Sequence, residues 1–264
     1  MLGKLMKYEW KATWKLLLSA NLVTVVMSIL AWIMVNAVEY SSDFSMVDFV
    51  SVMVLFTYVI GMFVVMVGTS IYLIYRFYTS TYGDQGYLLH TLPVDTHHII
   101  IAKVLVSAMW VLINMGVIYL SILLLFAGQE DMLKNMMEGF ANALEYLGAE
   151  KVTLFAGIMA LIAGLFDLFA RVLKVTACIS LGQLSPNHKL MLSFVWYFGF
   201  YVVQQLFKGL YVLLLFAFQK KRSYADYFSI FENHWEVMLL SGIVYCVVFY
   251  VLTWYVMSRK LNLD

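Results

Sequence analysis

Six long apolar segments, separated by shorter polar stretches, set the pattern of the chain. They lie near residues 16–38, 50–75, 99–127, 152–180, 190–218 and 237–257. Each reaches the roughly 20 residues that cross a hydrocarbon core about 30 Å thick. Because lipid offers backbone groups no partner, such segments must be helical. The pattern predicts an all-α integral membrane protein with six transmembrane helices, in a single domain over residues 1–264.

A separate amphipathic helix is predicted at the N-terminus, over residues 1–15. At about 100° per residue its lysines fall within about 80° of one another; they are Lys4, Lys7, Lys11 and Lys15. Apolar side chains cover the other side, namely Leu2, Leu5, Met6, Trp10 and Trp14. Such a helix lies in the interface of an anionic membrane. Glu9 projects from its apolar sector, where it is either solvated, paired with a lysine or in contact with a partner protein.

Two of the connecting segments, 128–151 and 219–236, also have helical periodicity. The first is acidic and rich in methionine, and the second repeats aromatic residues. Both are predicted to lie outside the cell. They are either amphipathic helices resting on the outer headgroups or lids over an exit path, for which adaptable methionines are suited.

Basic residues indicate the orientation, because they are enriched in cytoplasmic loops. Eleven lysines and arginines fall at the N-terminus, around the second and fourth loops and at the C-terminus, against five in the remaining loops. Lys208 lies within a span. This bias predicts that both termini are cytoplasmic.

Composition supports a lipid-facing protein. The chain is 63% hydrophobic and 12% charged, with a mean hydropathy of +0.85, whereas soluble domains have roughly 45–50% apolar and 25% charged residues. Six spans leave no room for a separate soluble domain. Cys178 and Cys246 lie in apolar runs and are interpreted as small core residues.

No motif of an enzyme is present in the sequence. It lacks the G-x-x-x-x-G-K-[ST] loop that binds nucleotide phosphates and the H-E-x-x-H metal motif. The adjacent His97 and His98 diverge by about 100° on a helix and cannot bind one metal ion together. No basic groove favours nucleic-acid binding. We therefore expect no catalytic residue, no metal ligand and no cofactor on this chain.

Polar residues inside the spans are candidates for a translocation path, because they are costly in lipid and are often functional. Asp167 and Arg171 have the favourable acid-then-base i,i+4 order, and form either a local ion pair or part of the path. Lys208 lies near Gln204 in the fifth span, and Gly209 follows it. Either the span breaks near Lys208 and Gly209, or the lysine reaches the outer surface.

The second loop carries the most specific pattern. It reads Tyr-Gly-Asp-Gln-Gly-Tyr-Leu-Leu-His-Thr-Leu-Pro from Tyr82 to Pro93. Asp84 can cap a short helix and Pro93 can end it, while Asp95 and Thr96 can cap the third span. A short cytoplasmic helix between two spans is predicted.

This loop resembles the cytoplasmic loop of bacterial ABC-2-type permeases, where a pattern close to G-D-E-G-Y-L-x-x-T-L-P precedes the third span. The N-terminal Met-Leu-Gly-Lys-Leu-Met-Lys-Tyr-Glu-Trp-Lys and the Ser180-Leu-Gly-Gln-Leu stretch are also similar to that family. Gln85 departs from it, where glutamate is expected. The resemblance implies a coupling helix that docks on a separate ATPase, through Tyr82, Gly83, Asp84, Gly86, Tyr87, Leu88, Leu89, Leu92 and Pro93.

The resemblance further implies two permease copies, as a homodimer, working with two ABC ATPase subunits that bind ATP and Mg. The chain is similar to permeases of toxin-peptide (phenol-soluble-modulin-like) and bacteriocin exporters, which implies export of amphipathic or hydrophobic peptides across the bacterial cytoplasmic membrane. The alternative is an ion-coupled carrier without an ATPase, which would need internal repeats and broken helices at the midplane. No convincing repeat is present in the sequence.

Overall fold

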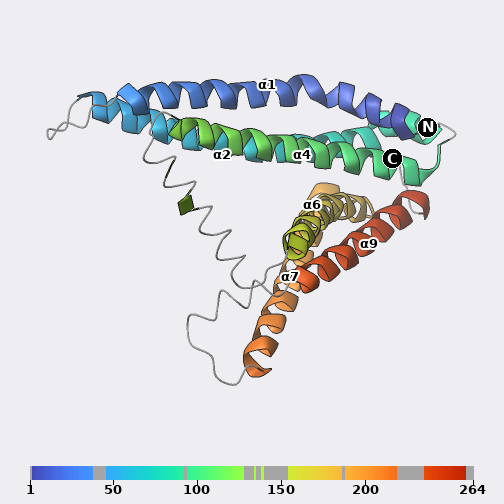
Figure 1. Ribbon diagram of the computed structural model, residues 1–264. Helices are drawn as coiled ribbons and strands as arrows, with labels where there is room; N and C mark the ends of the chain where they lie inside the picture. The colour runs from blue at the N-terminus through green and yellow to red at the C-terminus, as the bar shows by residue number, and fades with distance from the viewer. Residues whose placement is uncertain are drawn as a thin grey trace. The chain divides into compact units, whose positions relative to one another are not determined.

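A computed structural model describes residues 2–37, 46–91, 94–127, 134, 138, 139, 154–185, 188–218 and 235–259. Its described residues form helices and contain no strand (Figure 1). The helices are α1 (Leu2–Ala37), α2 (Met46–Thr81), α3 (Asp84–Thr91), α4 (Thr96–Phe126), α6 (Leu154–Gly182), α7 (Lys189–Phe218) and α9 (Trp235–Arg259). The predicted outer segments 128–151 and 219–236 lie almost entirely outside the described residues.

The chain divides into two compact units. Unit 1 holds residues 1–75 and 105–152, and unit 2 holds residues 76–104 and 153–264. Helices α2 and α4 each contribute to both units, whereas α1 belongs to unit 1 and α6, α7 and α9 belong to unit 2.

Five of the described helices are long and apolar enough to cross a membrane. The qualifying stretches are Leu2–Asn36, Phe49–Thr81, Thr96–Leu125, Lys189–Tyr211 and Val237–Arg259. Helix α6 is not among them, and it carries three charged residues between Asp167 and Lys174. The structure therefore confirms an all-α membrane protein.

The interior of unit 1 combines an apolar cluster with pairs of polar side chains. Leu17, Leu73, Val106 and Trp110 form the cluster, and Trp10 stacks on Trp110 with ring centroids 4.6 Å apart. Hydrogen bonds between side chains join its helices, among them Trp110 Nε1 to Thr13 Oγ1 at 2.9 Å, Asn114 Nδ2 to Thr69 Oγ1 at 2.8 Å, and Tyr58 with Ser121 at 2.7 Å. Side-chain hydrogen bonds between helices are typical of membrane proteins.

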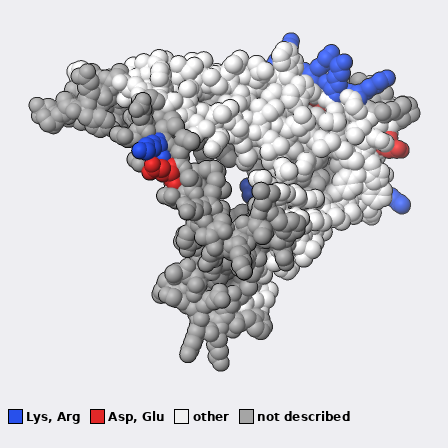
Figure 2. Space-filling view, viewed as in Figure 1, with Lys and Arg blue, Asp and Glu red and all other residues white. Residues whose placement is uncertain are grey.

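The predicted interfacial helix is not a separate element. Helix α1 continues without a break from Leu2 to Ala37, and no proline or glycine lies between Lys4 and Ala37. Trp10 and Met6, expected in the membrane interface, instead pack against the core of unit 1. The lysines of α1 gather toward its N-terminal end (Figure 2). Glu9 is 7% exposed, which excludes the solvated alternative.

The break considered for the fifth span is also absent. Helix α7 runs from Lys189 to Phe218 through Lys208 and Gly209. One glycine costs a helix only about 1 kcal/mol relative to alanine, which is too little to interrupt a long apolar helix. Lys208 is exposed on this continuous helix.

Candidate functional site

The short helix expected after Tyr82 is present. Helix α2 ends at Thr81, α3 occupies Asp84–Thr91, and α4 begins at Thr96. Of the residues assigned to this helix by resemblance, Leu92 and Pro93 lie outside the described residues, and the side chains of Asp84, Leu88 and Leu89 are not described. The structure thus defines the backbone of α3, the side chains of Gln85 and Tyr87, and the glycines at positions 83 and 86.

Two glycines allow α3 to begin directly against the end of α2. A Cβ atom on Gly83 would lie 2.8 Å from the carbonyl oxygen of Thr79, and one on Gly86 would collide with the carbonyl group of Thr81. The Gly86 N–H donates to the Gly83 carbonyl at 2.7 Å. Because the obstructing atoms belong to the backbone, a side chain at Gly86 cannot be accommodated without moving α3.

Tyr82 connects the turn between α2 and α3 to α6. Its hydroxyl donates to Ser180 Oγ at 2.6 Å, and Ser180 donates in turn to the Thr176 carbonyl at 2.8 Å. Burial raises the pKa of Tyr82 above its ordinary value, and the hydrogen bond with Ser180 partly opposes this shift. The hydroxyl therefore stays protonated and remains a hydrogen-bond donor at physiological pH.

The two helices that flank α3 are fixed by further contacts within unit 2. Lys103 Nζ on α4 donates to Ser80 Oγ on α2 at 2.5 Å. In the first turn of α4, His97 Nδ1 lies 2.6 Å from the Tyr250 hydroxyl, and its ring stacks on Trp254 of α9 at 5.3 Å. The ends of α2 and α4 on either side of α3 are therefore fixed within unit 2.

The outer surface of α3 is partly exposed. Tyr87 is 65% exposed, and Gln85, also exposed, accepts a hydrogen bond from Arg76 Nη1 at 3.2 Å. Although Gln85 lacks the charge of the glutamate expected there, it still connects α3 to α2. A large aromatic side chain thus projects from a helix whose base is fixed.

Replacing Tyr82 with phenylalanine should lower the stability of the chain by about 1 kcal/mol, because one buried hydrogen bond is lost while the ring remains. Thermal unfolding in detergent measures the change. Tyr78→Phe is the matched control, since the Tyr78 hydroxyl makes no hydrogen bond to another described residue. Equal effects of the two changes would contradict a specific role for the bond with Ser180.

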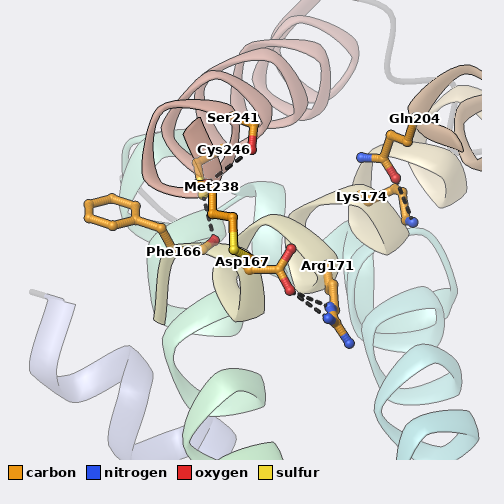
Figure 3. Close-up of polar contacts among 8 residues, drawn as sticks. All are labelled: Phe166, Asp167, Arg171, Lys174, Gln204, Met238, Ser241 and Cys246. Atoms are coloured by element: carbon orange, nitrogen blue, oxygen red, sulfur yellow. Dashed lines mark hydrogen bonds and ion pairs between the residues drawn. The ribbon is translucent and has the colours of Figure 1, made fainter. Parts of the chain in front are cut away.

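The second group of candidate residues lies on α6, which packs closely on α9. A Cβ atom on Gly242 would lie 3.1 Å from the Cβ atom of Phe166, and the Cys246 thiol donates to the Phe166 carbonyl at 3.3 Å (Figure 3). Next to this contact, the Asp167 carboxylate accepts from Arg171 Nη2 at 2.5 Å and from Nε at 2.8 Å. The expected ion pair is therefore formed.

The other two path candidates do not join this ion pair. Gln204 accepts a hydrogen bond from Lys174 Nζ at 3.0 Å, and Figure 3 shows the two extending toward each other from α7 and α6. Sequence reasoning used Lys174 only as evidence for orientation. Its position three residues after Arg171 was the available signal, but periodicity along α6 does not reveal which residue of α7 it meets.

Comparison with known proteins identifies no relative. No family model, no curated protein and no solved structure matches the chain. Function is therefore argued from the residues and from the geometry above.

Proposed function

We propose that the chain is the membrane-spanning subunit of an ATP-driven exporter, with ATP hydrolysed on a separate ABC ATPase. The observation that carries this proposal is α3. A short helix held between two long helices and exposing an aromatic side chain is suited to receive force from a docked protein. The residues of this helix are also those whose sequence resembles the ABC-2 coupling loop.

Six spans require α6 to cross the membrane as well. Its 29 residues extend about 44 Å at about 1.5 Å per residue, which exceeds a hydrocarbon core of about 30 Å. Its charges are compensated locally, since Asp167 pairs with Arg171 and Lys174 meets Gln204. With six spans and the observed distribution of lysine and arginine, both termini lie in the cytoplasm of a bacterial cell.

The cargo proposed is an amphipathic or hydrophobic peptide, moved by two copies of this chain. The alternative, an ion-coupled carrier, is supported less well because no described span is broken at the midplane: α7 continues through Lys208 and Gly209. Such carriers coordinate their ions with unwound backbone near the membrane midplane.

Co-purification tests the proposal. The tagged chain, extracted from its native membrane in mild detergent, should carry with it a subunit that hydrolyses ATP. Tyr87→Asp should reduce the recovered ATPase activity more than about tenfold, because a charge buried unpaired at an interface costs several kcal/mol. The hydrolysis rate of each eluate, divided by the amount of permease, gives the measurement.

The matched control is Tyr8→Asp on α1. Tyr8 and Tyr87 have similar exposures, 62% and 65%, so the same charge is introduced at an equally accessible tyrosine. Tyr8→Asp should retain the ATPase. If the native chain brings down no ATPase, the carrier alternative replaces the exporter, and if Tyr87→Asp retains it in full, α3 is not the docking element.

A further inference from the structure

The charges of α6 and α7 do not balance. Between them the two apolar helices carry Asp167, Arg171, Lys174 and Lys208 in their interior. Asp167 and Arg171 neutralise each other. The two lysines remain, and neither forms an ion pair with a described residue. Because charge inside a membrane is costly, a pair of uncompensated cations calls for an explanation.

Lys174 is surrounded by groups that favour a cation without neutralising it. It is 7% exposed, and its ammonium group donates to Gln204 Oε1 at 3.0 Å. The same group lies 4.9 Å from the ring centroid of Tyr197 and 5.9 Å from that of Tyr201. Aromatic faces attract a cation at these distances, yet they contribute no negative charge.

Lys174 lies in the interior of its helix and not at its end. It precedes the end of α6 at Gly182 by eight residues, about 12 Å at 1.5 Å per residue. The three groups that its ammonium contacts on α7, Tyr197, Tyr201 and Gln204, likewise lie away from both ends of that helix.

Lys208 adds a second positive charge beside the first. It follows Gln204 by four residues on α7, and residues at this spacing share one helix face. Because Lys174 donates to Gln204, one helical turn before Lys208, the two cations lie near the same face of α7 and repel each other. A single anion between them would relieve this repulsion and compensate both.

We propose that Lys174 and Lys208, with Tyr197 and Tyr201, bind a carboxylate of the exported peptide. This inference rests on the proposed function. Every linear peptide with an unmodified C-terminus carries an α-carboxylate whatever its sequence, so one cationic site can serve many peptides. Phospholipid phosphates are the less suitable ligand, because they lie outside the hydrocarbon core, whereas Gln204 and Lys208 lie 15 and 19 residues into the 30-residue α7.

The experiment uses an amphipathic helical peptide with a free C-terminal carboxylate and the same peptide with a C-terminal amide. The full chain is placed in nanodiscs of neutral phosphatidylcholine, and binding of each labelled peptide is followed by fluorescence anisotropy. We expect the acid to bind about tenfold more tightly than the amide, as one charge-assisted contact implies. Because no ATPase is needed, this readout is independent of the co-purification test.

Three variants locate the preference. Lys174→Met and Lys208→Met each remove one cation, and each should abolish most of the preference for the acid. Gln204→Glu keeps both lysines but gives Lys174 an internal carboxylate, so it should remove the preference while stabilising the contact between α6 and α7. Lys208 is exposed, so Lys208→Met keeps the test informative if Lys174→Met fails to fold.

Three outcomes would overturn the proposal. The native chain could bind acid and amide equally, or the preference could survive both Lys208→Met and Gln204→Glu. Anionic phosphatidylglycerol, added to the nanodiscs, could displace the acid peptide from the native chain but not from Lys208→Met, which would assign the site to a lipid phosphate. If the native chain co-purifies with an ATPase but binds neither peptide, the proposed function still stands and only the carboxylate site is wrong.

Discussion

On the proposed function, Gly86→Ala will uncouple ATP hydrolysis from export. The added methyl group collides with the Thr81 carbonyl. Neither the methyl carbon nor the carbonyl group can move by side-chain rotation, because the backbone fixes the position of both. Helix α3 must therefore move away from the end of α2. We expect export into inside-out vesicles to fall more than about tenfold, and a change of about 1.4 kcal/mol is enough to produce such a loss. The permease should stay folded and continue to bind an ATPase that hydrolyses ATP.

Gly116→Ala provides the matched control, because the same substitution in α4 meets no atom within 4 Å. A glycine in a helix interior is less favourable than alanine by roughly 0.5–1 kcal/mol, so this variant should be as stable as the native chain or more so. Both variants are assayed for thermal unfolding, ATP hydrolysis and export. Fully coupled export by Gly86→Ala would show that the position of α3 against α2 does not matter for transport.

Asp167→Asn should destabilise the chain and impair export. With α6 spanning the membrane as proposed, it leaves Arg171 without its counter-ion there, where an uncompensated arginine costs about 2.5–3.5 kcal/mol at a helix centre. The double variant Asp167→Asn with Arg171→Gln should regain both stability and export, because the two hydrogen bonds of the native pair connect only residues of α6.

Thermal unfolding and vesicle export, measured in parallel, separate the roles of this pair. Arg171→Gln alone should also destabilise the chain, because it leaves Asp167, the less exposed partner at 43% against 72%, without its counter-ion. A double variant that is stable but unable to export would place the pair in the translocation path.

Features that depend on local sequence could be predicted. Asp84 as a capping residue and Pro93 as the end of the helix were sufficient to expect a short helix, and α3 begins at Asp84. The ion pair of Asp167 and Arg171 followed from i,i+4 spacing, which is fixed within one helix.

Features that depend on contacts between helices could not be predicted. Periodicity showed an amphipathic N-terminus but not whether its apolar face meets lipid or protein, and Trp10 proved to stack on Trp110, 100 residues later. In the same way, Lys174 has no special context along α6. Its significance comes from Gln204 and two tyrosines on α7, and nothing in a single sequence aligns those two helices.

The hydrogen bond between Tyr82 and Ser180 has a consequence for the order in which the chain is assembled on the ribosome. Its partners are 98 residues apart, and translation at about 5–20 residues per second separates their synthesis by roughly 5 to 20 s. During that interval α3 is already made, but the hydroxyl of Tyr82 cannot yet bond to Ser180. The base of the short helix is therefore completed late, after α6 has been synthesised, so a nascent chain cannot hold α3 on its finished base before most of its helices have been made.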